Sequence, residues 1–514
     1  MASSKVTAIW LLVSLFLVDK VVEGRHLVTS VTGSMQNEPR QVRKSNEFPE
    51  GFRFGTSSSA YQYEGAVNAS GRGPCIWDSA SHTPGVIHDN STGDIATDHY
   101  HRYQEDIELM AHLGVGTYRF SIAWTRIFPD GRGPTPNAEG IAFYNRLIDT
   151  LLSTGIEPFV TVSHYDLPQT LQDEFGGWRS RHIVPLFTFF AETCFAAFGD
   201  RVKYWITINE IHNYAIKYTN IGCRNPSGLC APGNSSTWVY TAGHHMLLSH
   251  AFAVEVYRTK FQTKQGGKIG IVADAQWYEP YSDNPWDIAA VDRMQAFQVR
   301  WVLDPIYYGR YPEMLVDRLG DRLPRFSEGE AQLLRGSVDF LGINHYTTHY
   351  AVDQTNSTEQ LDSGAASVGS RGGVPIGPKA GSIWLNIVPF GIQKVLNYIR
   401  IQYNNPIVYI TENGVDEDND PGIPLDVALK DSFRTKYHVD YLSYVNAAIR
   451  DGCDVRGYFI WSLLDNFEWD DGLSKRFGLY YVDYDHNQTR YAKDSAKWFK
   501  EFLRPSLRPN HAKS

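Results

Sequence analysis

The sequence contains little cysteine, with five residues in a chain of 514. This small, odd number excludes a compact scaffold held by disulfides and prevents complete pairing within one chain. No C-x-x-C pair and no H-E-x-x-H motif occurs, so the sequence indicates no dedicated metal site. Cys223 and Cys230 bracket a short, turn-rich loop and form the one disulfide that we expect in an oxidising compartment. We expect Cys75, Cys194 and Cys453 to be buried thiols.

An excess of basic residues is also absent. The chain has 48 Lys and Arg against 57 Asp and Glu, which gives a formal net charge of −9. It therefore has no surplus of cations to neutralise a phosphate backbone, and we expect no nucleic-acid partner. Apolar residues make up 42% of the chain and charged residues 20%, which predicts a globular protein with a large core.

Only one long apolar run is present, at residues 6–18, and Lys5 precedes it. A basic start, a short apolar stretch and small residues up to Gly24 predict a secretory signal peptide at 1–24. A buried N-terminal helix is the alternative. The run is shorter than the roughly 20 apolar residues that span a bilayer, and nothing comparable follows it. We therefore expect no membrane association once the leader is removed.

Five N-x-[ST] sequons accompany this leader and predict glycosylation in the secretory pathway. They lie at Asn68, Asn90, Asn234, Asn356 and Asn487. The C-terminal residues NHAKS are not an ER-retention signal, so the sequence favours secretion over residence in the ER.

After the leader, the sequence predicts an irregular arm at 25–46, one domain at 47–504 and a tail at 505–514. No linker or low-complexity tract divides the domain. Short β-rich apolar segments alternate with longer segments of helical periodicity, such as 100–114 and 143–155. The predicted strands are 52–60, 117–124, 158–165, 204–210, 268–277, 339–347, 406–414 and 455–463.

Eight apolar strands separated by helices predict a parallel sheet that helices cover. Eight such units match an α/β fold of the TIM-barrel type, a single (β/α)8 barrel with long βα loops. The alternative is an open, doubly wound sheet, which requires a glycine-rich phosphate-binding turn after an early strand. No predicted strand ends in G-x-G-x-x-G.

Polar side chains at the carboxyl ends of barrel strands face the active site of such a fold. Glutamates stand at two of these ends, Glu210 after the fourth strand and Glu412 on the seventh. Two facing carboxylates suit glycosidic bond cleavage without a cofactor, because one protonates the departing oxygen while the other attacks the anomeric carbon or activates water. The alternative is that either glutamate is a helix-cap neighbour or part of a surface ion pair. The other notable strand-end residues are Gln62, Glu64, Arg119, His164, Asn209, Asn344, Tyr346, Trp461, Glu468 and Trp469.

Longer motifs resemble those of a known family. They are FGTSSSAYQYEGA, RGPCIWD, YRFSIAWTRIFP, WITINE, DFLGINHYT, ITENG and WSLLDNFEW, in this order between Phe48 and Leu503. In these motifs the chain resembles the plant β-glucosidases of glycoside hydrolase family 1, whose fold is a (β/α)8 barrel. The resemblance covers nearly the whole chain after the leader.

The resemblance implies that Glu210 is the general acid/base and Glu412 the nucleophile of a retaining β-glucosidase. Such an enzyme releases terminal non-reducing β-D-glucosyl residues from O-glucosides through a covalent glycosyl-enzyme. The resemblance also implies that Arg119, Asn344 and Tyr346 support catalysis and that no cofactor takes part. The implied substrate-binding residues are Gln62, His164, Asn209, Tyr346, Trp461, Glu468, Trp469 and Phe477, with Trp461 as the platform for the aglycone.

Individual residues refine this expectation. Plant thioglucosidases of the family carry Gln where this chain has Glu210, so an O-glycoside is favoured. A carboxylate at Glu468 suits free sugar hydroxyls and would repel a 6-phosphate. Tyr165 and Ile211 replace the usual Trp and Pro of the family, and both changes flank catalytic positions without replacing them.

Two other functions use the same motifs. A transglucosidase would pass the glucosyl group to an acceptor other than water, and an inactive relative would only bind sugar. The expected partner is a small-molecule or oligosaccharide β-glucoside, and the expected location is the apoplast or the vacuole. The sequence leaves open the natural aglycone and whether the chain forms a homo-oligomer.

Overall fold

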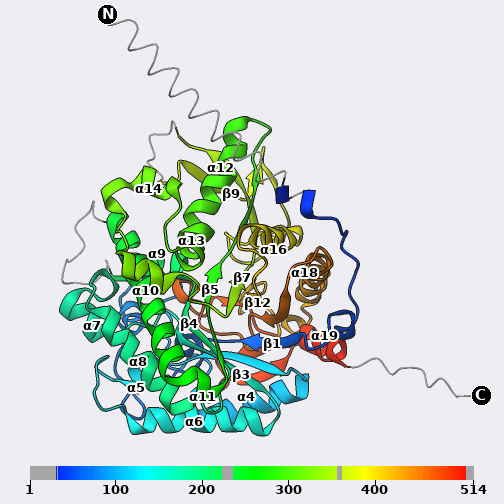
Figure 1. Ribbon diagram of the computed structural model, residues 1–514. Coiled ribbons are helices and arrows are strands. Elements are labelled where there is room, and N and C mark those ends of the chain that lie inside the picture. Colours follow the sequence, from blue (N-terminus) through cyan, green and yellow to red (C-terminus); the bar gives the residue numbers. More distant parts are fainter. Residues whose placement is uncertain (1–29, 32, 223–234, 356–361, 505–514) are drawn as a thin grey trace, which may run out of the picture.

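Eight parallel strands close into a barrel at the centre of the structure, a computed structural model that describes residues 30, 31, 33–222, 235–355 and 362–504 (Figure 1). The strands follow one another around the barrel in chain order, and the last pairs with the first. They are β1 (Arg53–Ser57), β2 (Thr117–Ser121), β3 (Glu157–Ser163), β4 (Tyr204–Asn209), β5 (Lys268–Asp274), β7 (Phe340–Asn344), β12 (Val408–Asn413) and β14 (Val455–Ile460). All eight predicted strands are present, and the predicted (β/α)8 fold is confirmed.

Helices connect successive strands and cover the outside of the barrel (Figure 1). The two predicted helical segments correspond to α4 (His99–Leu113) and α6 (Ala138–Ser153). Helix α4 ends at Gly114, whose φ of 88° lies in the left-handed region that glycine adopts at low cost. The other long helices are α8 (Ile183–Phe198), α9 (Ile211–Gly222), α10 (Ser235–Val256), α12 (Pro285–Gln295), α13 (Trp301–Tyr308), α16 (Phe390–Gln402), α18 (Ser432–Arg450) and α19 (Asp494–Leu503).

Shorter elements lie in the long connections between strands and helices. A three-stranded sheet, β6 (Trp277–Pro280), β8 (Thr348–Asp353) and β9 (Ala365–Val368), stands beside the barrel. The remaining strands are β10 (Ser370–Arg371), β11 (Val374–Pro375), β13 (Glu417–Asp418), β15 (Lys475–Arg476), β16 (Tyr480–Asp483) and β17 (Thr489–Ala492). The short α-helices are α2 (Ala60–Tyr63), α3 (Ile76–Ser81), α5 (Trp124–Ile127), α7 (Gln169–Phe175), α11 (Thr263–Gln265), α14 (Glu313–Leu319), α15 (Glu328–Leu334) and α17 (Leu425–Ala428). The 3-10 turns are η1 (Ser45–Glu47), η2 (Gly177–Arg179), η5 (Gly320–Arg322) and η6 (Trp469–Asp471), and η3 (Tyr257–Gln262) and η4 (Ala296–Arg300) are π-helical.

A cluster of mostly aromatic side chains fills the barrel interior. Phe159 of β3 stacks on Tyr204 of β4 with ring centroids 4.2 Å apart, and Phe340, Tyr409 and Phe459 meet these rings from the opposite strands. The interior is therefore packed, so the space for a ligand lies at the strand ends and not along the barrel axis.

The described part of the N-terminal arm lies against α16 and α18. Val31 is fully buried. The carboxylate of Asp451, which follows α18, accepts backbone hydrogen bonds from Gln36 and Asn37, each at 2.9 Å. It also accepts from Gln393 of α16 at 2.7 Å, so one carboxylate ties the arm to two outer helices.

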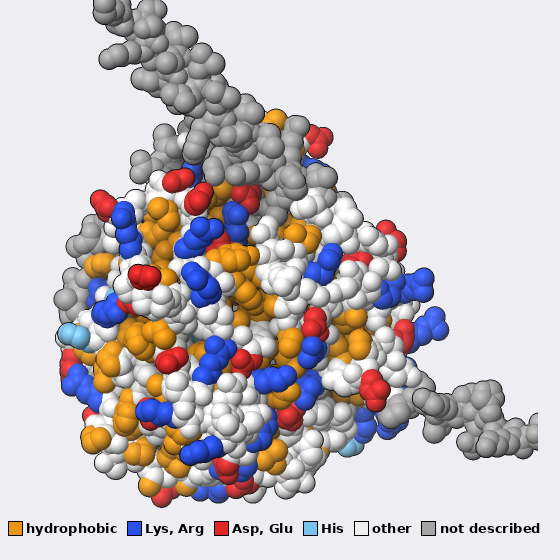
Figure 2. All heavy atoms as spheres, in the orientation of Figure 1, with side chains coloured by type: hydrophobic (Ala, Val, Ile, Leu, Met, Phe, Trp, Pro, Cys, Tyr) orange, Lys and Arg blue, Asp and Glu red, His pale blue; other side chains and the backbone are white. Residues whose placement is uncertain are grey.

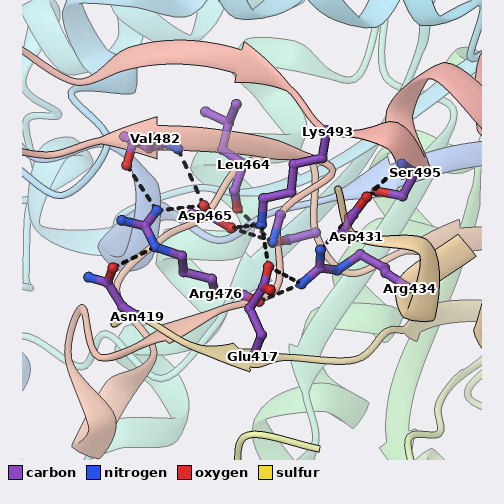
Figure 3. A network of polar contacts seen from close by, with 12 residues as sticks. Glu417, Asn419, Asp431, Arg434, Leu464, Asp465, Arg476, Val482, Lys493 and Ser495 are labelled. Carbon is purple, nitrogen blue, oxygen red and sulfur yellow. Dashed lines mark hydrogen bonds and ion pairs between the residues drawn. The ribbon is translucent and has the colours of Figure 1, made fainter. Parts of the chain in front are cut away.

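A buried network of charged side chains joins the loop after β14 to the C-terminal segment (Figure 3). Asp465 accepts from Lys493 at 2.9 Å and from Arg476 at 2.6 Å. Lys493 also contacts Glu417 at 3.1 Å, and Glu417 pairs with Arg434 at 3.1 Å. Although burial disfavours ionisation, Lys493 and Arg476 hold the pKa of Asp465 below its ordinary value. The network fixes the start of the loop that carries part of the candidate site.

The cysteines fall into two groups. Cys75, Cys194 and Cys453 are free and buried, as predicted. Cys223 and Cys230 lie outside the described residues, so their disulfide stays a prediction.

The predicted leader lies outside the described residues, as do the sequons at Asn234 and Asn356. The side chains of Asn68, Asn90 and Asn487 are exposed, and their glycosylation also stays a prediction. No helix in the described part of the chain is both long and apolar enough to cross a bilayer. On the face seen in Figure 2, basic and acidic side chains intermingle without a broad patch of one sign.

Candidate active site

The carboxyl ends of the barrel strands surround a cavity of about 380 Å³. Glu210, which follows β4, and Glu412, which lies in β12, both line this cavity. A hollow of this size accommodates a sugar ring and part of its aglycone. The other lining residues are His164, Tyr165, Asn213, Lys217, Asp274, Ala275, Gln276, Gln298, Asn344, Tyr346, Thr347, Ser382, Trp384, Trp461, Glu468, Trp469, Asp471 and Phe477.

The carboxylate of Glu412 is held between two donors. The guanidinium of Arg119 donates to Oε1, and the hydroxyl of Tyr346 donates to Oε2 at 2.7 Å. Arg119 is fully buried in β2, where a charge needs a partner, and the carboxylate of Glu412 is that partner. The two hydrogen bonds fix the orientation of this carboxylate, which a nucleophile requires.

Arg119 also links Glu412 to the ends of two further strands. It donates to Oδ1 of Asn209 in β4 at 2.6 Å, and Nδ2 of Asn209 lies 3.2 Å from Nε2 of His164. Burial and the charge of Arg119 hold the pKa of His164 well below its ordinary value, so this ring is neutral. A neutral Nε2 accepts the amide hydrogen of Asn209, and four strand ends are thereby connected beneath the cavity.

Glu210 stands at the turn between β4 and α9. Its φ of 48° lies in the left-handed region, which a residue with a Cβ rarely adopts. Asn344 of β7 donates to its Oε1 at 2.7 Å, and Asn213 of α9 donates to its Oε2 at 3.2 Å. The hydroxyl of Tyr165 also donates to Oε2. The side chain of Glu210 is thus held by hydrogen bonds from β7, from α9 and from the loop after β3.

The electrostatic surroundings of Glu210 favour its protonated form. Burial, followed by the negative charges of Glu412 and Asp274, raises its pKa from 4.5 to about 8. Glu210 therefore holds a proton at neutral pH beside a carboxyl group that Arg119 and Tyr346 orient. This pairing is what an acid and a nucleophile on one sugar carbon need.

Asp274 is a third carboxylate in the wall, at the end of β5. Its Oδ2 accepts from Nδ1 of His212 at 2.7 Å and from Nε2 of Gln298 at 2.9 Å. Burial opposes ionisation of Asp274, but His212 and Gln298 outweigh it and lower the pKa. Asp274 therefore remains charged close to Glu210.

The loop after β14 supplies a further carboxylate, Glu468. Its Oε2 lies 3.4 Å from Nε2 of Gln62, and its Oε1 lies 3.4 Å from Nε1 of Trp461. Burial and the nearby Asp416 raise the pKa of Glu468 well above its ordinary value. A carboxyl group so placed, next to a carboxamide and an indole N–H, can exchange hydrogen bonds with sugar hydroxyls.

Gly414, the last residue of the ITENG motif, lets β12 and the loop after β14 approach closely. A Cβ at this position would lie only 1.8 Å from the carbonyl oxygen of Trp461. The glycine therefore allows Trp461 and Glu412 to line the same cavity.

Aromatic rings form the remaining inner wall. Trp469 is largely buried, with ring centroids 4.9 Å from Tyr165 and 5.9 Å from His164. Its φ of 53° is again left-handed, as is the φ of 75° at Tyr165. Phe477 meets Tyr346 edge-on at 6.0 Å. Rigid apolar faces of this kind suit the C–H surfaces of a sugar ring.

The outer wall comes from the long segment between β7 and α16 and from α9. Trp384 is 42% exposed, and its ring lies edge-on to Tyr346 at 5.8 Å. On the other side, Lys217 of α9 forms an ion pair at 2.9 Å with Asp470, which neighbours Trp469. The mouth is thus partly aromatic and partly charged.

The residues predicted from the sequence occupy two layers. Glu210, Glu412, His164, Asn344, Tyr346, Trp461, Glu468, Trp469 and Phe477 line the cavity, whereas Gln62, Arg119 and Asn209 lie behind this layer and hold its members. Glu64, noted at the first strand end, belongs to neither layer. Its carboxylate pairs with Arg126 and accepts from Tyr144 at 2.7 Å, which makes it a structural residue.

Sequence reasoning missed several lining residues. Asp274 ends the fifth barrel strand, so the expectation that polar residues at strand ends face the active site applied to it as it did to Glu210 and Glu412. Asn213 lies three residues after Glu210, in the first turn of α9, so helical spacing was the signal for it. Trp384 comes from an irregular segment, and no pattern in the sequence marks it. Among the described residues, no group of three or more His, Cys, Asp or Glu is arranged to hold a metal ion.

Comparison with known proteins assigns the family. The model of glycosyl hydrolase family 1 matches residues 44–506. A β-glucosidase of Oryza sativa, number 34, is 53% identical over 480 residues, which cover 90% of this chain and 93% of the relative. The coniferin β-glucosidase of Pinus contorta is 52% identical over 473 residues, which cover 89% of this chain and 92% of the relative. The chain therefore belongs to glycosyl hydrolase family 1.

Solved structures agree with this assignment. A mutant rice β-glucosidase in a covalent complex with glucose (Glc) superimposes with a TM-score of 0.87 and 51% identity, covering 90% of this chain and 100% of that one. A β-glucosidase of the fungus Humicola insolens in complex with glucose gives a TM-score of 0.84 and 40% identity, covering 88% and 98%. Both of these solved structures are complexes with glucose.

Proposed function

We propose that the chain is a retaining β-glucosidase that hydrolyses terminal non-reducing β-D-glucosyl residues from O-glucosides. The observation that carries this proposal is the contrast between two carboxyl groups of one cavity. Glu412 is bonded by Arg119 and Tyr346, whereas the pKa of Glu210 is raised to about 8. Environments that separate two carboxyl groups in this way assign one as acid and the other as nucleophile.

The first step breaks the glycosidic bond. The ionised Glu412 attacks the anomeric carbon, while Glu210 gives its proton to the departing oxygen and releases the aglycone as an alcohol. Arg119 and Tyr346 orient the attacking carboxylate, so little reorganisation is needed as the new bond forms. The glycosyl-enzyme now carries an ester at Glu412.

Ester formation removes the negative charge of Glu412, and this change reverses the role of Glu210. Without that neighbouring charge, the ionised form of Glu210 becomes easier to reach. As a carboxylate, Glu210 takes a proton from water, whose oxygen attacks the anomeric carbon and frees Glu412. Two displacements at one carbon give net retention of configuration.

Two further residues support the substrate class. A proton donor at Glu210 serves O-glycosides, whose alcohol leaving groups depart poorly without protonation. Glu468 lines the cavity and offers a hydrogen-bond partner for free sugar hydroxyls, and Gln62 holds it from behind. Glucose is the hexose that the named relatives share.

We further propose that the chain enters the secretory pathway and works in the apoplast or the vacuole. The leader-like residues 1–24 and the exposed sequons Asn68, Asn90 and Asn487 support this. The proposed disulfide joins Cys223 to Cys230. Peptide mapping of protein purified from its native tissue tests all three features, and an unprocessed, unmodified N-terminus would contradict the location.

The activity is tested with purified protein and an aryl β-glucoside, with Glu412→Gln as the inactive control. Proton NMR of the first sugar released should show the β-anomer before mutarotation. Release of the α-anomer would contradict retention. A dominant transfer product at modest concentrations of added alcohol would show that the enzyme is a transglucosidase and not a hydrolase. Sugar binding without turnover would indicate an inactive relative.

A further inference from the structure

Tyr165 stands where the chain leaves β3, and its side chain reaches the acid/base. The residue is 3% exposed and has a φ of 75°. Its ring packs between Trp469, with centroids 4.9 Å apart, and Tyr214, with centroids 4.8 Å apart. These contacts restrict the orientation of the ring, whose hydroxyl contacts Oε2 of Glu210.

The contact differs in kind from the other two on Glu210. Asn344 and Asn213 each present an amide N–H to this carboxyl, and an N–H only donates. A phenol hydroxyl both donates and accepts. In this arrangement Tyr165 can match Glu210 in either protonation state by rotating its O–H alone, donating to the carboxylate and accepting from the acid, whereas an amide would have to flip its whole group.

We propose that Tyr165 is a positioning residue that holds Glu210 through both halves of the catalytic cycle by reversing the direction of their hydrogen bond. The proposal depends on the acid/base role of Glu210 under the proposed function. In the first half the hydroxyl accepts from the protonated carboxyl. In the second half it donates to the carboxylate and keeps the free oxygen directed at water.

Other charged groups face Glu210 from the surrounding elements and act together with Tyr165. Glu412 faces it from β12 and Asp274 from β5, and both raise its pKa. The hydroxyl of Tyr346, which follows β7, also lies near, since the charge of Glu210 helps to raise the pKa of Tyr346. The hydroxyl of Tyr165 lowers the pKa of Glu210, opposing these carboxylates. Its removal should therefore raise the pKa of Glu210 further.

The variant Tyr165→Phe removes the hydroxyl and keeps the ring. The acid must be protonated in the free enzyme, so the alkaline limb of the kcat/KM profile should move to higher pH by about one unit. For a dinitrophenyl β-glucoside, whose departure needs no proton, the base-assisted second step limits turnover. There kcat and KM should fall together about tenfold, with kcat/KM nearly unchanged.

The matched control is Tyr214→Phe. Tyr214 is the neighbouring buried tyrosine, and its hydroxyl accepts from Nε1 of Trp178 at 3.0 Å. This variant should leave the alkaline limb in place. Thermal unfolding of both variants separates loss of folding from loss of positioning.

An unmoved alkaline limb in a folded Tyr165→Phe protein would overturn the proposal, as would equal losses of kcat and kcat/KM on the activated substrate. If the wild-type protein showed no turnover, the proposed β-glucosidase activity itself would be contradicted. The two failures are therefore distinguishable.

Discussion

Asp274 accepts a hydrogen bond from His212 at 2.7 Å, and this partly buried pair lies beside the acid/base carboxyl. The contact lowers the pKa of Asp274 although burial opposes ionisation. The consequence falls on Glu210, whose pKa the charge of Asp274 helps to raise. A residue outside the expected catalytic pair thus helps to keep the acid protonated at neutral pH.

Replacing Asp274 by Asn should lower the pKa of Glu210 from its value of about 8, because one of the like charges disappears. Activity requires protonated Glu210, so it is present below this pKa and lost above it. The alkaline limb of kcat/KM should therefore move to lower pH by about one unit. Asp485→Asn, at an exposed aspartate, is the control. A limb that stays in place or moves upward would contradict the role of Asp274.

Replacing Glu412 by Ala should reduce turnover by roughly 10⁴-fold or more, because the attacking carboxylate is lost. Circular dichroism should show an intact fold, since Arg119 keeps its contact with Asn209. Added azide should enter the vacated space and restore turnover, giving a glucosyl azide of inverted configuration, which NMR identifies. Restored turnover with a β-configured azide would exclude Glu412 as the nucleophile.

Replacing Glu210 by Ala should affect substrates according to their leaving groups. Alkyl glucosides need a proton on the departing oxygen and should lose roughly 10²- to 10⁴-fold in kcat/KM. Dinitrophenyl glucoside leaves without that proton and should retain most of its kcat/KM. Steady-state kinetics over a series of leaving-group pKa values measures the difference. Equal losses across the series would remove Glu210 from the acid role.

Replacing Lys493 by Met should destabilise the protein, because the variant leaves Asp465 with one cationic partner fewer in a fully buried site (Figure 3). Breaking a buried pair on one side typically costs about 3–5 kcal/mol. Lys497→Met is the control, in the helix that begins directly after Lys493, since Lys497 pairs with Asp494 at the surface. Denaturant unfolding of both variants measures the difference in unfolding free energy. Equal stability would show that the network around Asp465 contributes little.

The fold was predictable because both faces of each barrel strand are covered. Strands such as β2 and β4 are buried throughout, and β4 (YWITIN) is accordingly largely apolar in sequence. Their ends were less certain. The predicted segment 268–277 continued beyond Asp274, where the chain leaves the barrel and begins β6 at Trp277. Apolar character alone does not separate a barrel strand from a second strand that follows it closely.

The site was predictable where a motif or a strand end marked the residue. Glu210, Glu412 and Glu468 were found this way. The contact of Tyr165 with Glu210 was not, because it depends on a left-handed φ and on packing against Trp469. The position of Trp384 depends on the course of an irregular segment, which local sequence preferences do not determine.

The contacts of Asp451 indicate at which residue a protein expressed from a shortened gene should begin. A recombinant protein begun at the first barrel strand would lack Gln36 and Asn37, and with them three of the hydrogen bonds that this carboxylate accepts. It would also uncover the apolar surface on which Val31 is buried. Affinity tags are therefore better fused ahead of residue 30 than at the apparent border of the barrel.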